Sequence, residues 1–143
     1  MSRHLVLLSL LGLSALTLPA QAQQSASAQA CLAAGGNPEI RACLERRERE
    51  SEDLLSRSEA DFLVTVQQSG LAGADRTAIA KSLGASSGPY RIYRSRQCDV
   101  QALVAAGGTS AAYRRFDCQI ALNEQRLEHI RELMDAGQLK AVI

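Results

Sequence analysis

Four cysteines are the residues of this chain best suited to covalent chemistry, and their spacing favours disulfide bonds over metal binding. They are Cys31, Cys43, Cys98 and Cys118. An even number of cysteines in a small exported chain is typical of disulfides. A four-cysteine zinc site is the alternative, but such sites usually contain C-x2-4-C pairs, which this chain lacks. We therefore predict two disulfides and no metal.

Turn residues lie midway between these cysteines and favour one pairing. The first two cysteines are equidistant from Asn37 in a Gly-Gly-Asn-Pro stretch, and the last two are equidistant from Gly108 in a Gly-Gly-Thr stretch. Each pair would then face across a hairpin of two helices. Four cysteines allow three pairings, and the spacing favours first with second and third with fourth without excluding the others.

The remaining residues offer little for catalysis. Beyond residue 22 the single histidine is His129, which has no obvious serine or cysteine partner for acyl transfer. Four carboxylates stand among arginines, which predicts a solvated helix face instead of an acid–base pair in a pocket. They are Glu48, Glu50, Glu52 and Asp53. We predict no catalytic residues and no cofactor, and hence no enzymatic activity.

The segment Tyr90–Arg96 holds the densest group of side chains suited to recognition. It mixes aromatic and guanidinium groups, which are enriched at binding hot spots. The candidate binding residues are Arg91, Tyr93, Arg94 and Arg96. A structural role is the alternative, because Tyr90 and Tyr93 begin a predicted apolar face that continues through Val100 and Val104. Arg94 also suits an ion pair with a carboxylate or a helix end.

The first 22 residues have the pattern of a cleavable secretory signal. A basic Arg3 precedes the apolar run Leu5–Leu18, and Pro19–Ala22 supplies the small residues before a cleavage site. The apolar run is shorter than a membrane-spanning helix, and no cysteine follows it directly, as lipid attachment would require. We predict cleavage after Ala22 and a periplasmic or secreted protein that is not inserted in the membrane.

The charge balance argues against nucleic acid as a partner. The chain has 16 basic and 15 acidic side chains, and loss of Arg3 with the leader brings the net charge near zero. Nucleic-acid binders usually concentrate positive charge, whereas here both signs are interspersed. We therefore predict a protein partner. The sequence does not determine the oligomeric state.

Helical patterning runs through the exported part, and strand-like alternation is absent. The sequence predicts a long helix over 39–68, a short helix over 75–83, a loop over 84–89, and a helix from Pro89 to the Gly107-Gly108 turn. A final helix extends to Gly137. The predicted fold is all-α, a small disulfide-stapled bundle of about three main helices in antiparallel hairpins with short additional helices. Residues 23–30 are predicted as a flexible segment or a short helix, 31–137 as the domain, and 138–143 as a tail.

Three motifs in the second half resemble the LprI-like lysozyme-inhibitor domain family. They are Tyr90-x2-Tyr93-Arg94-x3-Cys98, the turn Gly107-Gly108-Thr109, and Cys118 followed by Arg126 and Leu127. Cys31 and Cys43 match the first cysteine pair of that family. The chain departs from the family pattern at Tyr90, Ser95, Thr109 and Asn123, where tryptophan, aspartate, serine and threonine are usual. Leu55-Ser56 is a weak match to the signature of the family's first long helix.

The resemblance implies a helical envelope or secreted protein that inhibits lysozyme. An inhibitor of this kind would occlude the glycan cleft without catalysis of its own, and an exposed arginine from the 91–96 segment could meet the carboxylates that line such a cleft. The alternative is a periplasmic interaction or assembly module of the cell envelope that has no effect on lysozyme.

Overall fold

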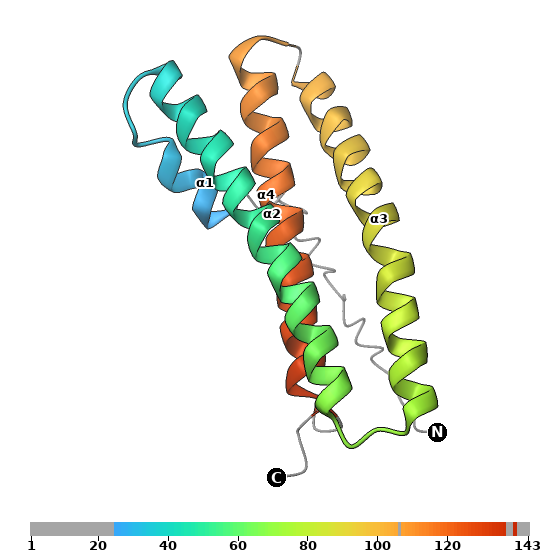
Figure 1. Ribbon diagram of the computed structural model, residues 1–143. Helices are drawn as coiled ribbons and strands as arrows, with labels where there is room; N and C mark the ends of the chain where they lie inside the picture. Colours follow the sequence, from blue (N-terminus) through green and yellow to red (C-terminus); the bar gives the residue numbers. More distant parts are fainter. Residues whose placement is uncertain (1–24, 106, 137–138, 140–143) are drawn as a thin grey trace, which may run out of the picture.

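The computed structural model describes residues 25–105, 107–136 and 139. The predicted leader, residues 1–22, lies outside this part. Four helices follow one another: α1 (Ala26–Cys31), α2 (Asn37–Gln68), α3 (Gly73–Val104) and α4 (Gly108–Asp135). All regular elements in the described ranges are helices, which confirms the all-α fold with three main helices (Figure 1).

Successive long helices run antiparallel, so α2 and α4 run in the same direction, and α4 is the central helix (Figure 1). It packs along both α2 and α3, whereas α2 and α3 contact each other little. The short α1 lies against the first half of α2 at the end of the bundle where α3 turns into α4 (Figure 1). The α2–α3 turn lies at the opposite end. None of the described helices is long and apolar enough to span a membrane.

Local chemistry explains where the helices begin and end. The Ser25 hydroxyl accepts a hydrogen bond from the Ala28 N–H at 3.0 Å and thereby caps α1. For residues 23–30 the structure therefore has the short helix, one of the two predicted alternatives, from Ala26 onward. Between α3 and α4, Gly107 and Gly108 have φ of 88° and 69°, a left-handed backbone that only glycine adopts freely.

Helix α3 is continuous from Gly73 to Val104, so the predicted loop over 84–89 is wrong. The Ser86 hydroxyl donates to the Leu83 carbonyl at 2.9 Å. The single Ser87 hydroxyl proton is shared between Glu59 on α2, at 2.8 Å, and the Leu83 carbonyl, at 3.0 Å. The hydroxyls of both serines therefore have hydrogen-bond acceptors within the helical structure, although the Gly/Ser-rich sequence of this segment favoured a loop. Pro89 is accommodated inside the helix.

The interior consists of two apolar clusters, one towards each end of the bundle. The cluster at the α1 end contains Ala28, Cys31, Leu44 and Ile120, with Tyr113 and Phe116 at its edge. The larger cluster at the other end contains Leu55, Phe62, Val66, Leu127, Ile130 and Leu139. Leu139 is buried although it falls in the predicted tail. Between the two clusters lies a polar layer, which includes the buried residues Ser51, Arg94 and Asn123.

Both disulfides form with the favoured pairing. Cys31 joins Cys43, and Cys98 joins Cys118, with Cα–Cα distances of 5.5 Å in each case. The first ties α1 to α2, and the second ties α3 to α4. The described residues contain no cluster of side chains able to hold a metal ion.

Candidate functional site

Helix α3 divides the four candidate binding residues between two opposite faces. Arg91 and Arg94 point towards α2 and α4, and Arg94 is only 8% exposed. Tyr93 and Arg96 are exposed on the other side. At 3.6 residues per turn, the midpoint of Tyr93 and Arg96 lies about 160° around the helix axis from the midpoint of Arg91 and Arg94. The two pairs therefore cannot form a single surface. The structure therefore assigns them to separate features: a buried network and an exposed face.

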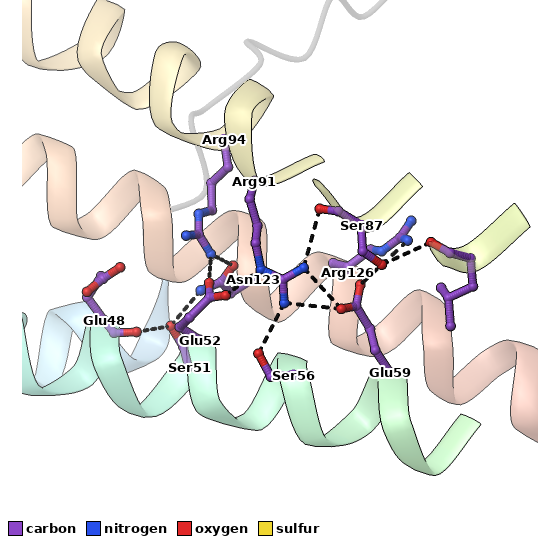
Figure 2. A network of polar contacts seen from close by, with 11 residues as sticks. Glu48, Ser51, Glu52, Ser56, Glu59, Ser87, Arg91, Arg94, Asn123 and Arg126 are labelled. Carbon is purple, nitrogen blue, oxygen red and sulfur yellow. Dashed lines mark hydrogen bonds and ion pairs between the residues drawn. The ribbon is translucent and has the colours of Figure 1, made fainter. Parts of the chain in front are cut away.

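Arg91 joins α3 to α2 through two carboxylates (Figure 2). Its Nε donates to Glu52 Oε1 at 2.6 Å, and Nη1 and Nη2 both donate to Glu59 Oε2 at 3.1 Å. Nη2 also donates to the Ser56 hydroxyl at 3.1 Å. This guanidinium has partners on two successive turns of α2, so its side chain is fixed in place.

Arg94 extends the network to the centre of the bundle. Its Nη1 donates to Glu52 Oε2 and to Asn123 Oδ1. Asn123 on α4 is fully buried, and its Nδ2 donates to the Ser51 hydroxyl at 2.9 Å. One arginine and one amide therefore connect α2, α3 and α4, because each makes bonds to side chains of both other helices.

Arg126 on α4 closes the network on the side of the larger apolar cluster. Its Nη2 donates to the Ser86 hydroxyl at 3.0 Å and lies 3.8 Å from Glu59 Oε1. The guanidinium carbon lies 5.3 Å from the centre of the Tyr90 ring, within cation–π range. The Tyr90 hydroxyl donates to the Leu122 carbonyl at 2.6 Å. This tyrosine is the half-buried end of the predicted apolar face.

The electrostatics of this layer suit a structural role. Burial tends to raise the pKa of the Glu52 carboxyl, but hydrogen bonds from Arg94 and Arg91 outweigh burial and hold that pKa below its usual value. Glu52 therefore stays ionised at neutral pH and is a poor general acid or base. Burial also raises the pKa of Tyr90. The expectation that Glu52 lies on a solvated face is wrong, because its partners come from α3, about forty residues later in the chain.

The opposite face of α3 is apolar and exposed. Its five large apolar side chains are between 54% and 81% exposed. They are Ile92, Tyr93, Val100, Leu103 and Val104. Together with Arg96 they form what we call the α3 stripe. The prediction that Tyr93, Val100 and Val104 pack in the interior is therefore wrong, since only Tyr90 of that series is half-buried.

The Cys98–Cys118 disulfide ties α3 to α4 on the side of α3 that lies opposite the stripe. Cys98 is fully buried against α4, while Arg96 and Val100, two positions away on either side, lie about 200° around the helix. A disulfide to another helix requires Cys98 to face inward, so its prediction already implied that Arg96 and Val100 face solvent. Arg96 makes no ion pair with any described residue. Nearby, Asp99 pairs with Arg115 of α4 at 2.8 Å and adds a second link behind the stripe.

His129 is an exposed side chain on the second half of α4. Its Nδ1 lies 3.8 Å from Glu132 on the same helix, and neither side chain is buried. A catalytic histidine would be expected against a buried carboxylate or a nucleophile, and the described residues place neither beside it. His129 is therefore an exposed surface side chain.

Comparison with known proteins adds no assignment. No protein-family model matches the chain, and neither a curated protein sequence nor a solved structure matches it. The function must be inferred from the residues of the chain itself.

Proposed function

We propose that this protein is an exported, non-catalytic binding protein of the LprI-like type that inhibits lysozyme by occluding its glycan cleft. The observation that carries this proposal is the α3 stripe, a row of exposed apolar side chains around Arg96, which pairs with no carboxylate among the described residues. A disulfide ties this part of α3 to α4. Contiguous exposed apolar side chains on a small protein are typical of interaction surfaces.

Export is supported by the leader pattern and by the two disulfides. Disulfides persist in oxidising compartments and are rare in the cytosol. We propose cleavage after Ala22 and a periplasmic or secreted location for the mature chain. The two disulfides then stabilise a domain whose interior is built largely from aliphatic side chains.

The stripe has the chemistry needed to fill a glycosidase cleft. Such a cleft contains a pair of carboxylates, one of which stays ionised, so an arginine is a complementary group. Arg96 supplies the guanidinium, and Tyr93 lies one turn earlier as an aromatic anchor. Because α3 is already fixed to α4, little conformational entropy is lost when the stripe binds.

The test is lysis of a peptidoglycan suspension by c-type lysozyme, with the oxidised mature protein titrated in. We expect dose-dependent protection that is lost after reduction and alkylation. Arg96→Glu and Tyr93→Ala should each weaken inhibition about tenfold or more. Arg49→Glu is the matched control, because Arg49 is an exposed arginine on α2, away from the stripe. No protection at large molar excess, or equal inhibition by Arg96→Glu, contradicts the proposal.

The second candidate is an envelope interaction or assembly module. The same stripe favours it, because a permanent partner could cover these apolar side chains without any effect on lysozyme. Co-purification of a stable envelope partner, lost with Leu103→Asp and accompanied by unchanged lysis, would select this function over inhibition. Leu103 is suited to this test because it is strongly exposed and makes no contribution to the core.

A further inference from the structure

An apolar groove lies at the end of the bundle that has no disulfide. It runs between the first half of α3 and the second half of α4, with Phe62 of α2 at its base, and has a volume of about 770 Å³. This volume is in the range of small-molecule sites. The main apolar side chains along it are Leu71, Ile79, Leu83, Ile130, Leu133 and Leu139.

The groove is long and differs in polarity from end to end. Arg126 and Ser86, bonded to each other at 3.0 Å, lie at the inner end beside the polar layer. Ala136 lies ten residues further along α4, which corresponds to about 15 Å. Because α3 runs antiparallel to α4, Asp75 near its start lies at this outer end. The inner end therefore carries a cation and the outer end an anion.

Arg126 lines the inner end of the groove, and no described carboxylate lies at hydrogen-bond distance from its guanidinium. The nearest one, on Glu59, is 3.8 Å from Nη2. This contrasts with Arg91, whose donors engage two carboxylates at hydrogen-bond distance. His129, one turn beyond Arg126 on α4, also lines the groove. The inner end is thus complementary to an anionic group.

The walls suit a narrow occupant better than a flat one. Leu71, Ile79 and Leu83 are only partly exposed, since they also pack on the larger apolar cluster. A flat partner surface would leave much of these side chains uncovered, whereas an extended hydrocarbon chain can follow the groove between the two helices. Each methylene buried in this way adds a favourable free energy of hydrophobic transfer.

We propose that this groove binds a free single-chain anionic amphiphile, such as a fatty acid. The carboxylate lies at the inner end near Arg126 and Ser86, and the hydrocarbon chain follows Leu83, Ile79 and Leu133 towards the outer end. This site is separate from the α3 stripe, so it does not depend on the function proposed above.

The experiment is calorimetric titration of the oxidised mature protein with dodecanoate below its critical micelle concentration. Dodecyltrimethylammonium, which has the same chain and the opposite charge, is titrated in parallel. We expect saturable one-to-one binding of dodecanoate and at least about tenfold weaker binding of the cation. His129→Glu, at an exposed position, should weaken dodecanoate binding severalfold and strengthen binding of the cation.

A groove-filling variant tests the location. Ala78 is exposed on the groove wall, so Ala78→Trp should fill the groove without disturbing the core and weaken dodecanoate binding about tenfold or more. Ala85→Trp is the matched control, an exposed alanine of the same helix outside the groove, and should bind as the unmodified protein does. Circular dichroism confirms that both variants are folded.

Four outcomes would overturn the proposal. They are absence of saturable dodecanoate binding, equal binding of the two head groups, equal binding by Ala78→Trp, and binding only to phosphatidylglycerol vesicles, which would indicate a membrane surface as the ligand. A dimer that dissociates in Ala78→Trp, with no amphiphile bound, would show that a second copy of the chain covers the groove.

Discussion

The two ends of the bundle are stabilised in different ways. At the α1 end both disulfides accompany the smaller apolar cluster, whereas the other end has the larger cluster and no covalent link. A helix of six residues such as α1 cannot bury enough apolar surface to stay in place by packing alone. The disulfides of this fold therefore lie where hydrophobic burial is least.

The polar layer separates the two ends and also joins them. It contains three arginines and two glutamates, namely Arg91, Arg94, Arg126, Glu52 and Glu59. A buried ion pair contributes little net stability compared with apolar packing, but loss of one partner is costly because the other charge is left buried. The following predictions test how far each end depends on this layer and on its own contacts.

The largest effect is expected from Arg94→Ala. This change leaves Glu52 and Asn123 without their shared partner in the interior, so the free energy of unfolding should fall by about 3–5 kcal/mol. Urea unfolding followed by circular dichroism measures it. Arg96→Ala, two residues away on the exposed face, should change stability by less than about 0.5 kcal/mol. Equal losses in the two variants would show that the layer does not hold the ends together.

Removal of the Cys98–Cys118 disulfide should have the next largest effect. The double change of both residues to alanine should lower the free energy of unfolding by about 3 kcal/mol, since a loop of 20 residues is no longer closed in the unfolded chain. Removal of the Cys31–Cys43 disulfide, which closes 12 residues, should cost about 0.5 kcal/mol less.

Hydrogen exchange would show whether this loss is confined to one end. We expect faster exchange over the end of α3 and the start of α4, with the second half of α4 still protected by the larger cluster. Uniformly faster exchange along α4 would contradict the picture of two separately stabilised ends.

Acid should weaken the layer through Glu52. Its pKa is lower in the folded protein than in the unfolded chain, so its stabilising contribution is complete at neutral pH and is lost as the pH falls from about 5 through the folded pKa. Glu52→Gln should lower stability by about 1–3 kcal/mol at pH 7 and flatten its decline in acid.

Asp117, at the α1 end, provides the opposite case. Burial raises the pKa of its carboxyl, although the Ser25 N–H donates to it, so protonation favours the folded state as the pH falls. Asp117→Asn should therefore steepen the decline of stability in acid, where Glu52→Gln flattens it. Unfolding in urea at several pH values between about 3 and 7 measures both slopes, and equal slopes would contradict the assignment.

The smallest effect is expected at Gly84 in α3. A Cβ added there meets no atom within 4 Å, so Gly84→Ala should raise the free energy of unfolding by about 0.5–1 kcal/mol through the higher helix propensity of alanine. Gly107→Ala also meets no atom, but its φ of 88° is strained for alanine, so that variant should lose about 1 kcal/mol. Thermal unfolding distinguishes a gain from a loss.

The sequence predicted those features that depend on neighbours along the chain. The disulfide pairing follows from local spacing and is confirmed. The turns were predicted around Asn37 and Gly108, and they lie just before these residues, which begin α2 and α4. The prediction of a loop over 84–89 was wrong because the Ser87 hydroxyl donates a hydrogen bond to Glu59, which is 28 residues earlier in the chain. The sequence around Ser87 gives no indication of this distant partner.

The candidate binding residues could be predicted only as a group. Arg91, Tyr93, Arg94 and Arg96 are adjacent in sequence, and local charge patterns do not reveal which guanidinium faces a carboxylate on another helix. For Glu52, ion pairs with nearby arginines of α2 were as consistent with the sequence as pairs with α3. The side of α3 that faces inward is set by long-range packing against α4.

The order of the disulfides along the chain has a consequence for biogenesis. Each joins cysteines that are consecutive in the sequence, Cys31 with Cys43 and Cys98 with Cys118. If the chain is exported with its N-terminus first, as we propose, the first pair can be oxidised before Cys98 has crossed the membrane. An oxidase that joins cysteines in order of emergence then produces the native connectivity directly, so this protein should mature without the help of a disulfide isomerase.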